Sequence, residues 1–298
     1  MTPRFFDIHS HTNFAAFDGD RDLALKRAFE AGVFMNVVGT QKDTSKVAVE
    51  LAEKYNGVYA TVGLHPIHTG KSFHDKEELG PSFAEASEGK EGFVSRGEEF
   101  DYEYYKKLAS HPKVVAIGEC GLDYYRSKNY ELGIMNGGQK RQEETFRRQI
   151  ELAIEVKKPL MLHIRNGDNR SAYNDAFSIL NSYFIPHNSS PRGNLHFFAG
   201  TIEEAKPFLD AGFTFSFTGV ITFARSYDEI IRYLPFGRIL SETDAPYVAP
   251  APYRGKRNEP LYVREVVKAI ARIRNEDEEK ARTQILKNAE KLFNISLA

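Results

Sequence analysis

The sequence has little cysteine, no long apolar run and no excess of charge of either sign. A single cysteine, Cys120, excludes an internal disulfide framework and is typical of a reducing, cytoplasmic setting. No segment is apolar over the length that spans a bilayer, and we expect no signal peptide at the start. The formal net charge of −1 argues against a broad basic face for nucleic acid, but not against a nucleic-acid substrate held locally by metal ions.

Short β-branched or aromatic runs alternate with longer stretches of helical period, which indicates repeated βα units. The candidate strands are residues 4–9, 33–38, 58–63, 114–118, 159–164, 194–198, 213–217 and 238–242. Eight parallel strands close a TIM barrel, so the predicted fold is α/β, a single (β/α)8 barrel. With no repeat, low-complexity tract or linker, residues 1–298 are expected to form one domain.

The predicted helices include one after Gly138, in which Phe146 and Ile150 share an apolar face. Residues 260–274 and 276–294 are predicted as two extra C-terminal helices, separated at Asn275. Residues 71–100 are polar and rich in glycine, which indicates an elaborated loop after the third strand. This loop is either a substrate lid or, as is commoner for such composition, a solvated surface insertion.

The end of the first predicted strand carries Asp7, His9 and His11. Because residues two apart in a strand share a face, these three side chains are expected to point the same way. Two imidazoles that project together can bind one divalent ion, although a lone His-x-His pattern is more often an ordinary strand end. The motif alone does not decide between these two interpretations.

Five more candidate ligands follow other predicted strands: His65, Glu119, His163, His196 and Asp244. In a parallel barrel the C-terminal strand ends meet at one rim, where barrel enzymes place their active sites. Burying so many titratable groups without partners would cost several kcal/mol for each group. Metal ions remove this cost, because imidazole and carboxylate are ligands of borderline and hard cations. The set therefore predicts two divalent ions, with Mg, Mn and Zn as the candidates.

Several longer segments match a known pattern: DIHSH at 7–11, VGLHP at 62–66, IGECGLDYY at 117–125, a QxxxFxxQ pattern at 142–149, PLMLHIR at 159–165, HFFAG at 196–200, SETDAPY at 241–247 and RGKRNEP at 254–260. Together they resemble the TatD-type deoxyribonuclease family, metal-dependent hydrolases of the amidohydrolase superfamily of TIM barrels. The resemblance runs from Phe5 to about Phe293. One departure is Ile67, where the family often has a second histidine after the proline; His68 is the alternative at this point.

The resemblance implies a division of the ligands between two ions: His9, His11 and Asp244 for the first, His163 and His196 for the second, and Glu119 as the bridge. Many superfamily relatives that cleave amides, lactones or phosphotriesters have a carboxylated lysine at the position of Glu119. Two ions bring four positive charges and the two carboxylates remove two, so the assembled site would be near +2 and attract a phosphodiester. Asp244 is the candidate general base, and Glu242 and Asp7 are expected to orient ligands.

The expected function is that of a metal-dependent DNase, a 3′→5′ exonuclease that hydrolyses single-stranded or frayed DNA through a metal-activated water. The expected substrate contacts are His65, Arg254, Asn258 and Arg165, with Arg126 as a further candidate. Arg254 would otherwise form a surface ion pair, and Tyr124 and Tyr125 either stack on a base or cap the barrel. The alternatives are a hydrolase of a small amide, ester or lactone, and a non-catalytic metal-binding or partner-binding barrel. No membrane partner is expected, and the oligomeric state is left open.

Overall fold

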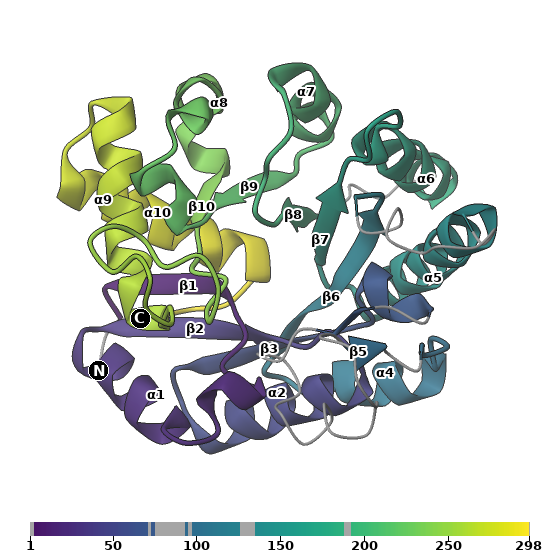
Figure 1. Ribbon diagram of the computed structural model, residues 1–298, viewed down its shortest axis with the longest axis horizontal. Coiled ribbons are helices and arrows are strands. Elements are labelled where there is room, and N and C mark those ends of the chain that lie inside the picture. Colours follow the sequence, from purple (N-terminus) through teal and green to yellow (C-terminus); the bar gives the residue numbers. More distant parts are fainter. Residues whose placement is uncertain are drawn as a thin grey trace.

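The computed structural model describes residues 3–70, 73–74, 93–94, 97–125, 135–187 and 192–297. In these ranges, eight parallel strands form one sheet that curves into a nearly closed barrel with helices on its outside (Figure 1). In sheet order the strands are β1 (Phe5–Ser10), β2 (Val33–Val38), β3 (Val58–Val62), β6 (Val114–Asp123), β7 (Leu160–Arg165), β8 (Gly193–Leu195), β9 (Thr214–Phe217) and β10 (Ile239–Ser241). Each overlaps one predicted strand, so the predicted barrel is confirmed.

Helices follow most of the strands along the chain. They are α1 (Arg21–Glu30), α2 (Lys42–Lys54), α4 (Tyr102–Ala109), α5 (Met135–Val156), α6 (Ala172–His187), α7 (Ile202–Asp210), α8 (Asp228–Tyr233), α9 (Val263–Arg274) and α10 (Glu278–Phe293). The two closing helices are α9 and α10, and Asn275 ends α9 in a left-handed conformation, as a helix C-terminus favours. None of the helices described is both long and apolar enough to cross a membrane.

The two largest hydrophobic clusters among the described residues hold the barrel together. The larger one lies between the sheet and the surrounding helices, where Val33 and Val37 of β2 pack with Leu25 of α1. The smaller one joins Phe6 of β1 to Met161 of β7, and these strands are not neighbours in the sheet. Side chains of such strands meet only across the barrel interior, and residues of α10 join them there. The barrel interior is therefore packed on the side of α10, and the open rim is left for a site.

Hydrogen bonds beside the predicted ligands close the barrel between β1 and the segment after β10. The Asp244 N–H donates to the His9 carbonyl at 2.9 Å, and the His11 N–H donates to the Ala245 carbonyl at 2.7 Å. The buried Asp7 carboxylate accepts from the backbone N–H of Thr243 at 2.9 Å. The same contacts that close the barrel therefore fix the positions of His9, His11 and Asp244.

The predicted loop at 71–100 lies largely outside the described residues. Two short strands within it, β4 (Phe73–His74) and β5 (Phe93–Val94), pair antiparallel as a separate sheet. The interpretation of this loop as a lid concerns residues that are not described, and it stays a prediction.

Candidate metal centre

Glu119 is presented by an irregular part of β6. The register between β6 and β7 shifts between Ile117 and Cys120, and the peptide that joins Gly118 to Glu119 is cis. Gly118 and Gly121 flank the glutamate with φ values of +151° and +139°. A Cβ at Gly121 would lie 2.1 Å from the His163 carbonyl oxygen, so only glycine permits this close approach of β6 to β7.

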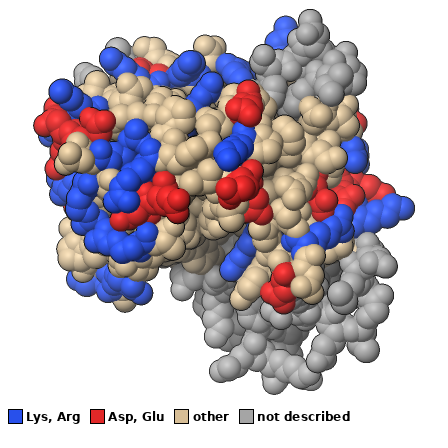
Figure 2. Space-filling view, turned by 90° about the horizontal axis from the view of Figure 1, so that it is seen from above, with Lys and Arg blue, Asp and Glu red and all other residues tan. Residues whose placement is uncertain are grey.

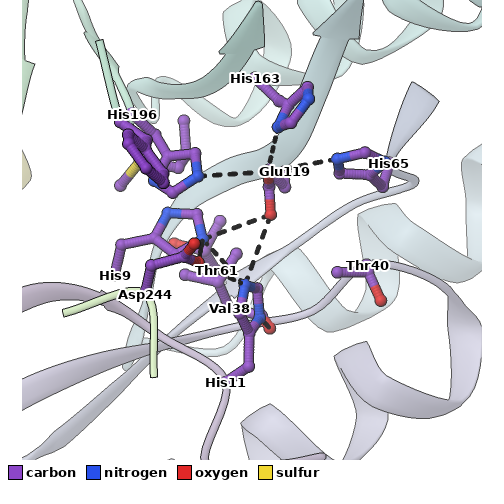
Figure 3. A network of polar contacts seen from close by, with 12 residues as sticks. His9, His11, Val38, Thr40, Thr61, His65, Glu119, His163, His196 and Asp244 are labelled. Atoms are coloured by element: carbon purple, nitrogen blue, oxygen red, sulfur yellow. Dashed lines mark hydrogen bonds and ion pairs between the residues drawn. The ribbon is translucent and has the colours of Figure 1, made fainter. Parts of the chain in front are cut away.

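The Glu119 carboxylate lies at the centre of the predicted ligands, and its two oxygens face different histidines (Figure 3). Oε2 lies 3.3 Å from His9 Nε2 and 3.7 Å from His11 Nε2. Oε1 faces the other side of the site, 2.8 Å from His163 Nδ1 and 3.6 Å from His196 Nε2. A carboxylate with ligand nitrogens on both oxygens is arranged as a bridge between two positions.

The first position is formed by β1 and the segment after β10. His9 Nε2 and His11 Nε2 lie 3.1 Å apart, and His11 Nε2 lies 3.3 Å from Asp244 Oδ1. Neighbouring ligands of one ion, with bond lengths of about 2.0–2.2 Å, lie about 2.8–3.6 Å apart. His9 Nδ1 has no hydrogen-bond partner among the described residues, although it is buried. The spacing and chemistry of these donors fit a divalent ion.

Hydrogen-bonding partners outside the ligand set decide which nitrogen of each ring faces the centre. His11 Nδ1 lies 2.9 Å from the carbonyl oxygen of Val38 and therefore donates to it, which leaves Nε2 free as a ligand. His196 Nδ1 forms an ion pair with Glu242 Oε1, 3.0 Å away, and its Nε2 faces Glu119. A carbonyl or carboxylate behind an imidazole is the usual support of a metal-binding histidine.

His65 has the opposite arrangement. Its Nδ1 accepts a hydrogen bond from the Ile67 N–H at 3.1 Å, so the neutral ring carries its proton on Nε2. Burial and His163 lower the pKa of His65 to about 4, which keeps the ring neutral at pH 7. Nε2 lies 3.3 Å from Glu119 Oε1. In this tautomer Nε2 of His65 carries a proton, which makes it a hydrogen-bond donor at the centre.

Asp123 is a site residue that the sequence analysis did not single out. It lies at the end of β6, is 1% exposed, and places Oδ2 3.0 Å from His163 Nε2. The imidazole of His163 is therefore held between Asp123 and Glu119. The side-chain amide of Gln142 fixes the backbone of Asp123, accepting from its N–H at 3.0 Å and donating to its carbonyl at 3.2 Å.

The pKa values show how strongly these groups interact. Burial alone would raise the pKa of Glu119, but the nearby His65, His196 and His9 outweigh it and hold the pKa well below its usual range. Burial and His196 lower the pKa of His9 to about 3. Burial also lowers the pKa of His196, yet Glu242 and Glu119 outweigh this effect and raise it to about 10. Binding of an ion would displace protons from such ligands.

The expected division of ligands is only partly reproduced. Among the described residues, three groups have ligand atoms close enough to hold an ion: His9 with His11 and Asp244, His9 with Glu119 and His196, and His65 with Glu119 and His163. The expected pairing of His163 with His196 is not one of them, and their ring centroids are 6.1 Å apart. Both rings nevertheless face Glu119 Oε1.

Two residues expected at the site have another role. The Asn258 side chain is buried and donates to the carbonyls of Thr243 at 2.8 Å and Tyr247 at 2.6 Å. It holds the turn that contains Asp244 and has no donor left for substrate. Asp7 acts on the ligand His9 through the backbone. Among the described residues its carboxylate contacts no imidazole, and it accepts from the N–H groups of His9 at 3.3 Å and Thr243 at 2.9 Å.

The expected arginine contacts lie over aromatic rings. Arg165 is exposed with its guanidinium 4.0 Å from the ring centroid of Tyr125, and Arg254 lies 3.7 Å from that of Phe223. Arg126 lies outside the described residues. Tyr124 is buried and its hydroxyl donates to Asp175 at 2.9 Å, so it packs in the fold, whereas Tyr125 is 49% exposed.

A pocket of about 410 Å³ opens over the centre. Charged and polar side chains line its floor: His11, His65, Glu119, Asp123, His163, Arg165, His196 and Asp244. Hydrophobic and aromatic residues form much of the rest, among them Ile67, Phe197, Tyr227, Tyr247 and Val248. A barrel with buried histidines and carboxylates at the C-terminal strand ends, open to a pocket, defines a metal-dependent hydrolase.

Comparisons with known proteins identify the family. The model of the family described as "TatD related DNase" matches residues 6–294, and the chain belongs to this family of metal-dependent hydrolases. Over 294 residues it is 34% identical to an uncharacterized metal-dependent hydrolase, YabD, of Bacillus subtilis, with 98% of this chain and 99% of that protein covered. It is 30% identical over 298 residues to a protein of Salmonella typhimurium named 3′-5′ ssDNA/RNA exonuclease TatD, with 97% and 99% covered.

Solved structures show the same fold. The structure of YjjV, a TatD homolog from Escherichia coli, aligns with a TM-score of 0.74 at 26% identity and covers 99% of this chain and 100% of its own. A TatD-family hydrolase from Entamoeba histolytica aligns with the same TM-score of 0.74 at 21% identity, covering 98% and 99% of the two chains. The barrel is therefore shared along the whole chain.

The contact between Asp123 and His163 leads to a first prediction. In Asp123→Ala the His163 ring loses the carboxylate that orients it, and metal affinity is expected to fall by about 10- to 100-fold. Asp123→Asn keeps an acceptor at the same place and should lose less. Calorimetric metal titration measures both, and wild-type affinity in the alanine variant would contradict the assigned role.

Asn258 gives a second prediction. Asn258→Ala leaves the carbonyls of Thr243 and Tyr247 buried without a donor, and the free energy of unfolding should fall by about 2–4 kcal/mol. Denaturant unfolding of the metal-free protein measures the change. Asn258→Asp keeps the acceptor for the Glu259 N–H but has no donor for the two carbonyls, so it should not restore the lost stability. Unchanged stability together with a raised KM would restore Asn258 as a substrate contact.

Proposed function

We propose that the protein is a nuclease that removes nucleotides from the 3′ end of single-stranded or frayed DNA. The observation that carries the proposal is the Glu119 carboxylate between two groups of histidines, at the floor of an open pocket. Two-ion centres of this kind suit phosphodiester hydrolysis, because they stabilise the attacking and the leaving oxygens together. The exonuclease name of the Salmonella relative supports the same substrate class.

Several side chains have defined tasks in this reaction. One or two divalent ions, with Mg, Mn and Zn as candidates, would supply charge neutralisation and an activated water when bound. Asp244 lines the pocket, and one of its carboxylate oxygens would orient the attacking water and accept its proton. The Nε2–H of His65 would donate a hydrogen bond to a phosphate oxygen. Arg165, which lines the same pocket, would bind a phosphate.

The charge distribution supports a substrate that contacts few phosphates. The chain has a formal net charge of −1, and the face seen in Figure 2 mixes Lys and Arg with Asp and Glu. The DNA strand would then be attracted by the metal centre and by single arginines such as Arg165 and Arg254. A strand end fits this requirement better than a long duplex footprint does. The cytoplasmic setting expected from the lone buried Cys120 belongs to the same proposal.

Hydrolysis of a small amide, ester or lactone is the weaker candidate. Among the described residues that line the pocket there is no lysine, and Glu119 lies where a carboxylated lysine would be expected for such substrates. An assay with a panel of such substrates would reveal this activity if it replaced that on DNA.

The nuclease assay is the central test. Metal-replete protein is incubated with 5′- and 3′-labelled strands, single and double, in Mg, Mn and Zn. The 3′ label should be released as mononucleotide, while the 5′-labelled strand shortens stepwise, and EDTA should abolish both. Asp244→Ala should lower kcat by about 100- to 10,000-fold, as loss of a general base does.

Asp210→Ala, at the exposed end of α7, is the matched control and should retain full activity. The proposal is wrong if metal-replete wild-type protein degrades neither DNA nor RNA.

Substitution of His65 distinguishes a hydrogen-bond donor from a metal ligand at this position. If it donates to phosphate, His65→Ala should lower kcat/KM by about 10-fold or more and leave the metal content unchanged, whereas His11→Ala should lose metal. His65→Gln retains an N–H donor and should recover part of the activity. Metal analysis of the purified variants gives the answer without an activity assay. Loss of an ion in His65→Ala would make His65 a ligand.

A further inference from the structure

Phe197 lines the pocket with an aromatic ring, and its backbone has an unfavourable conformation. The residue follows His196, lines the pocket and is partly exposed. Its φ of +43° lies in the left-handed region, which bulky residues avoid. The N–H of Phe197 donates to Glu242 Oε1 at 2.7 Å, and this bond holds the conformation. The strain serves to keep the ring beside the metal centre instead of in the core.

Away from the pocket, the non-glycine residues with positive φ in the described chain have an ordinary explanation. Three of them follow the C-termini of helices, where this conformation is the usual cap: Lys157, Asn275 and Asn294. The other three non-glycine residues with positive φ are Phe197, Asp244 and Val248, and all three line the pocket. Backbone strain without a capping role is therefore concentrated at the pocket wall.

A second ring and an arginine complete this wall. Tyr227 lines the pocket from the segment after β9 and packs edge-on against Phe217, with ring centroids 6.5 Å apart. Arg165 lines the pocket two residues after His163 and is steadied over the Tyr125 ring. Burial raises the pKa of Tyr227 while the Arg165 charge lowers it, so the two side chains lie within electrostatic range. No carboxylate of the described chain forms an ion pair with Arg165 in the structure.

We propose that this wall is a nucleobase subsite: Phe197 and Tyr227 stack on a base next to the scissile phosphate, and Arg165 binds the adjoining phosphate. The inference rests on the proposed nuclease activity and adds the residues that select the substrate. An aromatic face stacks on any base, but only when the base is unpaired and unstacked from its neighbours. The pocket volume of about 410 Å³ lies within the usual range of small-ligand sites, about 300–1,000 Å³.

The test compares two single-stranded substrates that differ only in their bases. One carries ordinary nucleotides, and the other carries abasic residues at its last two 3′ positions. Wild-type protein should prefer the base-bearing strand in kcat/KM by about 5- to 100-fold, the range that base–aromatic stacking provides. Phe197→Leu should move this ratio toward one, and Phe197→Tyr should preserve it. Tyr227→Leu and Tyr227→Phe test the second ring in the same way.

The ratio compares two substrates of one enzyme, so a variant that binds less metal or folds less well does not change it. Tyr233→Leu, an aromatic that is 41% exposed on α8 and does not line the pocket, is the control and should keep the wild-type ratio. A wild-type ratio near one, or an unchanged ratio in both leucine variants, would overturn the subsite alone. Failure to hydrolyse either strand and bis(p-nitrophenyl) phosphate would overturn the nuclease activity and the subsite with it.

Discussion

The carboxylate of Glu119, 3% exposed among five imidazoles, is the constraint on which the site depends. An ionised carboxylate that loses water must be paired, because its burial alone is very costly. Each surrounding ring therefore has to present the correct nitrogen, and partners such as Val38 and Glu242 decide which nitrogen that is. The outer hydrogen bonds are as much a part of the metal centre as the ligands themselves.

Closure of the barrel and assembly of the site use the same contacts. The backbone of His9 and His11 bonds to that of Asp244 and Ala245, and Asp7 and Asn258 secure the same turn from either side. The barrel cannot open between β1 and β10 without separating ligands of one position. Asn258 acts on the site through the backbone, because it holds the turn that carries Asp244.

Most of the barrel and the ligand set could be predicted from the sequence, because strand period and strand ends are local properties. A parallel barrel then brings His9, Glu119 and Asp244 together at one rim without further information. Asp123 was missed because the fourth strand was expected to end at residue 118, whereas β6 continues to Asp123. Residues four apart in a strand share a face, so the longer strand would have placed Asp123 with Glu119.

A contact between a side chain and a distant backbone group cannot be predicted from the sequence. Asn258 has a polar side chain that suits a substrate contact. Only the fold shows that its amide already forms its hydrogen bonds within the protein. The φ of Phe197 is another such property, since nothing in its immediate sequence requires a left-handed backbone. Both features depend on strands that are far apart along the chain.

Glu242 connects the chemistry of the centre to the shape of the pocket. One oxygen, Oε1, lies 3.0 Å from His196 Nδ1 and also accepts the Phe197 N–H at 2.7 Å, while Oε2 accepts from Ser216. Orientation of a ligand and position of the aromatic wall are therefore set by one buried carboxylate. A change at Glu242 would disturb both together, whereas a change of the Phe197 side chain leaves the backbone contact in place. In the proposed subsite, the ring at position 197 can therefore be changed while the bond between the backbone and Glu242 stays in place.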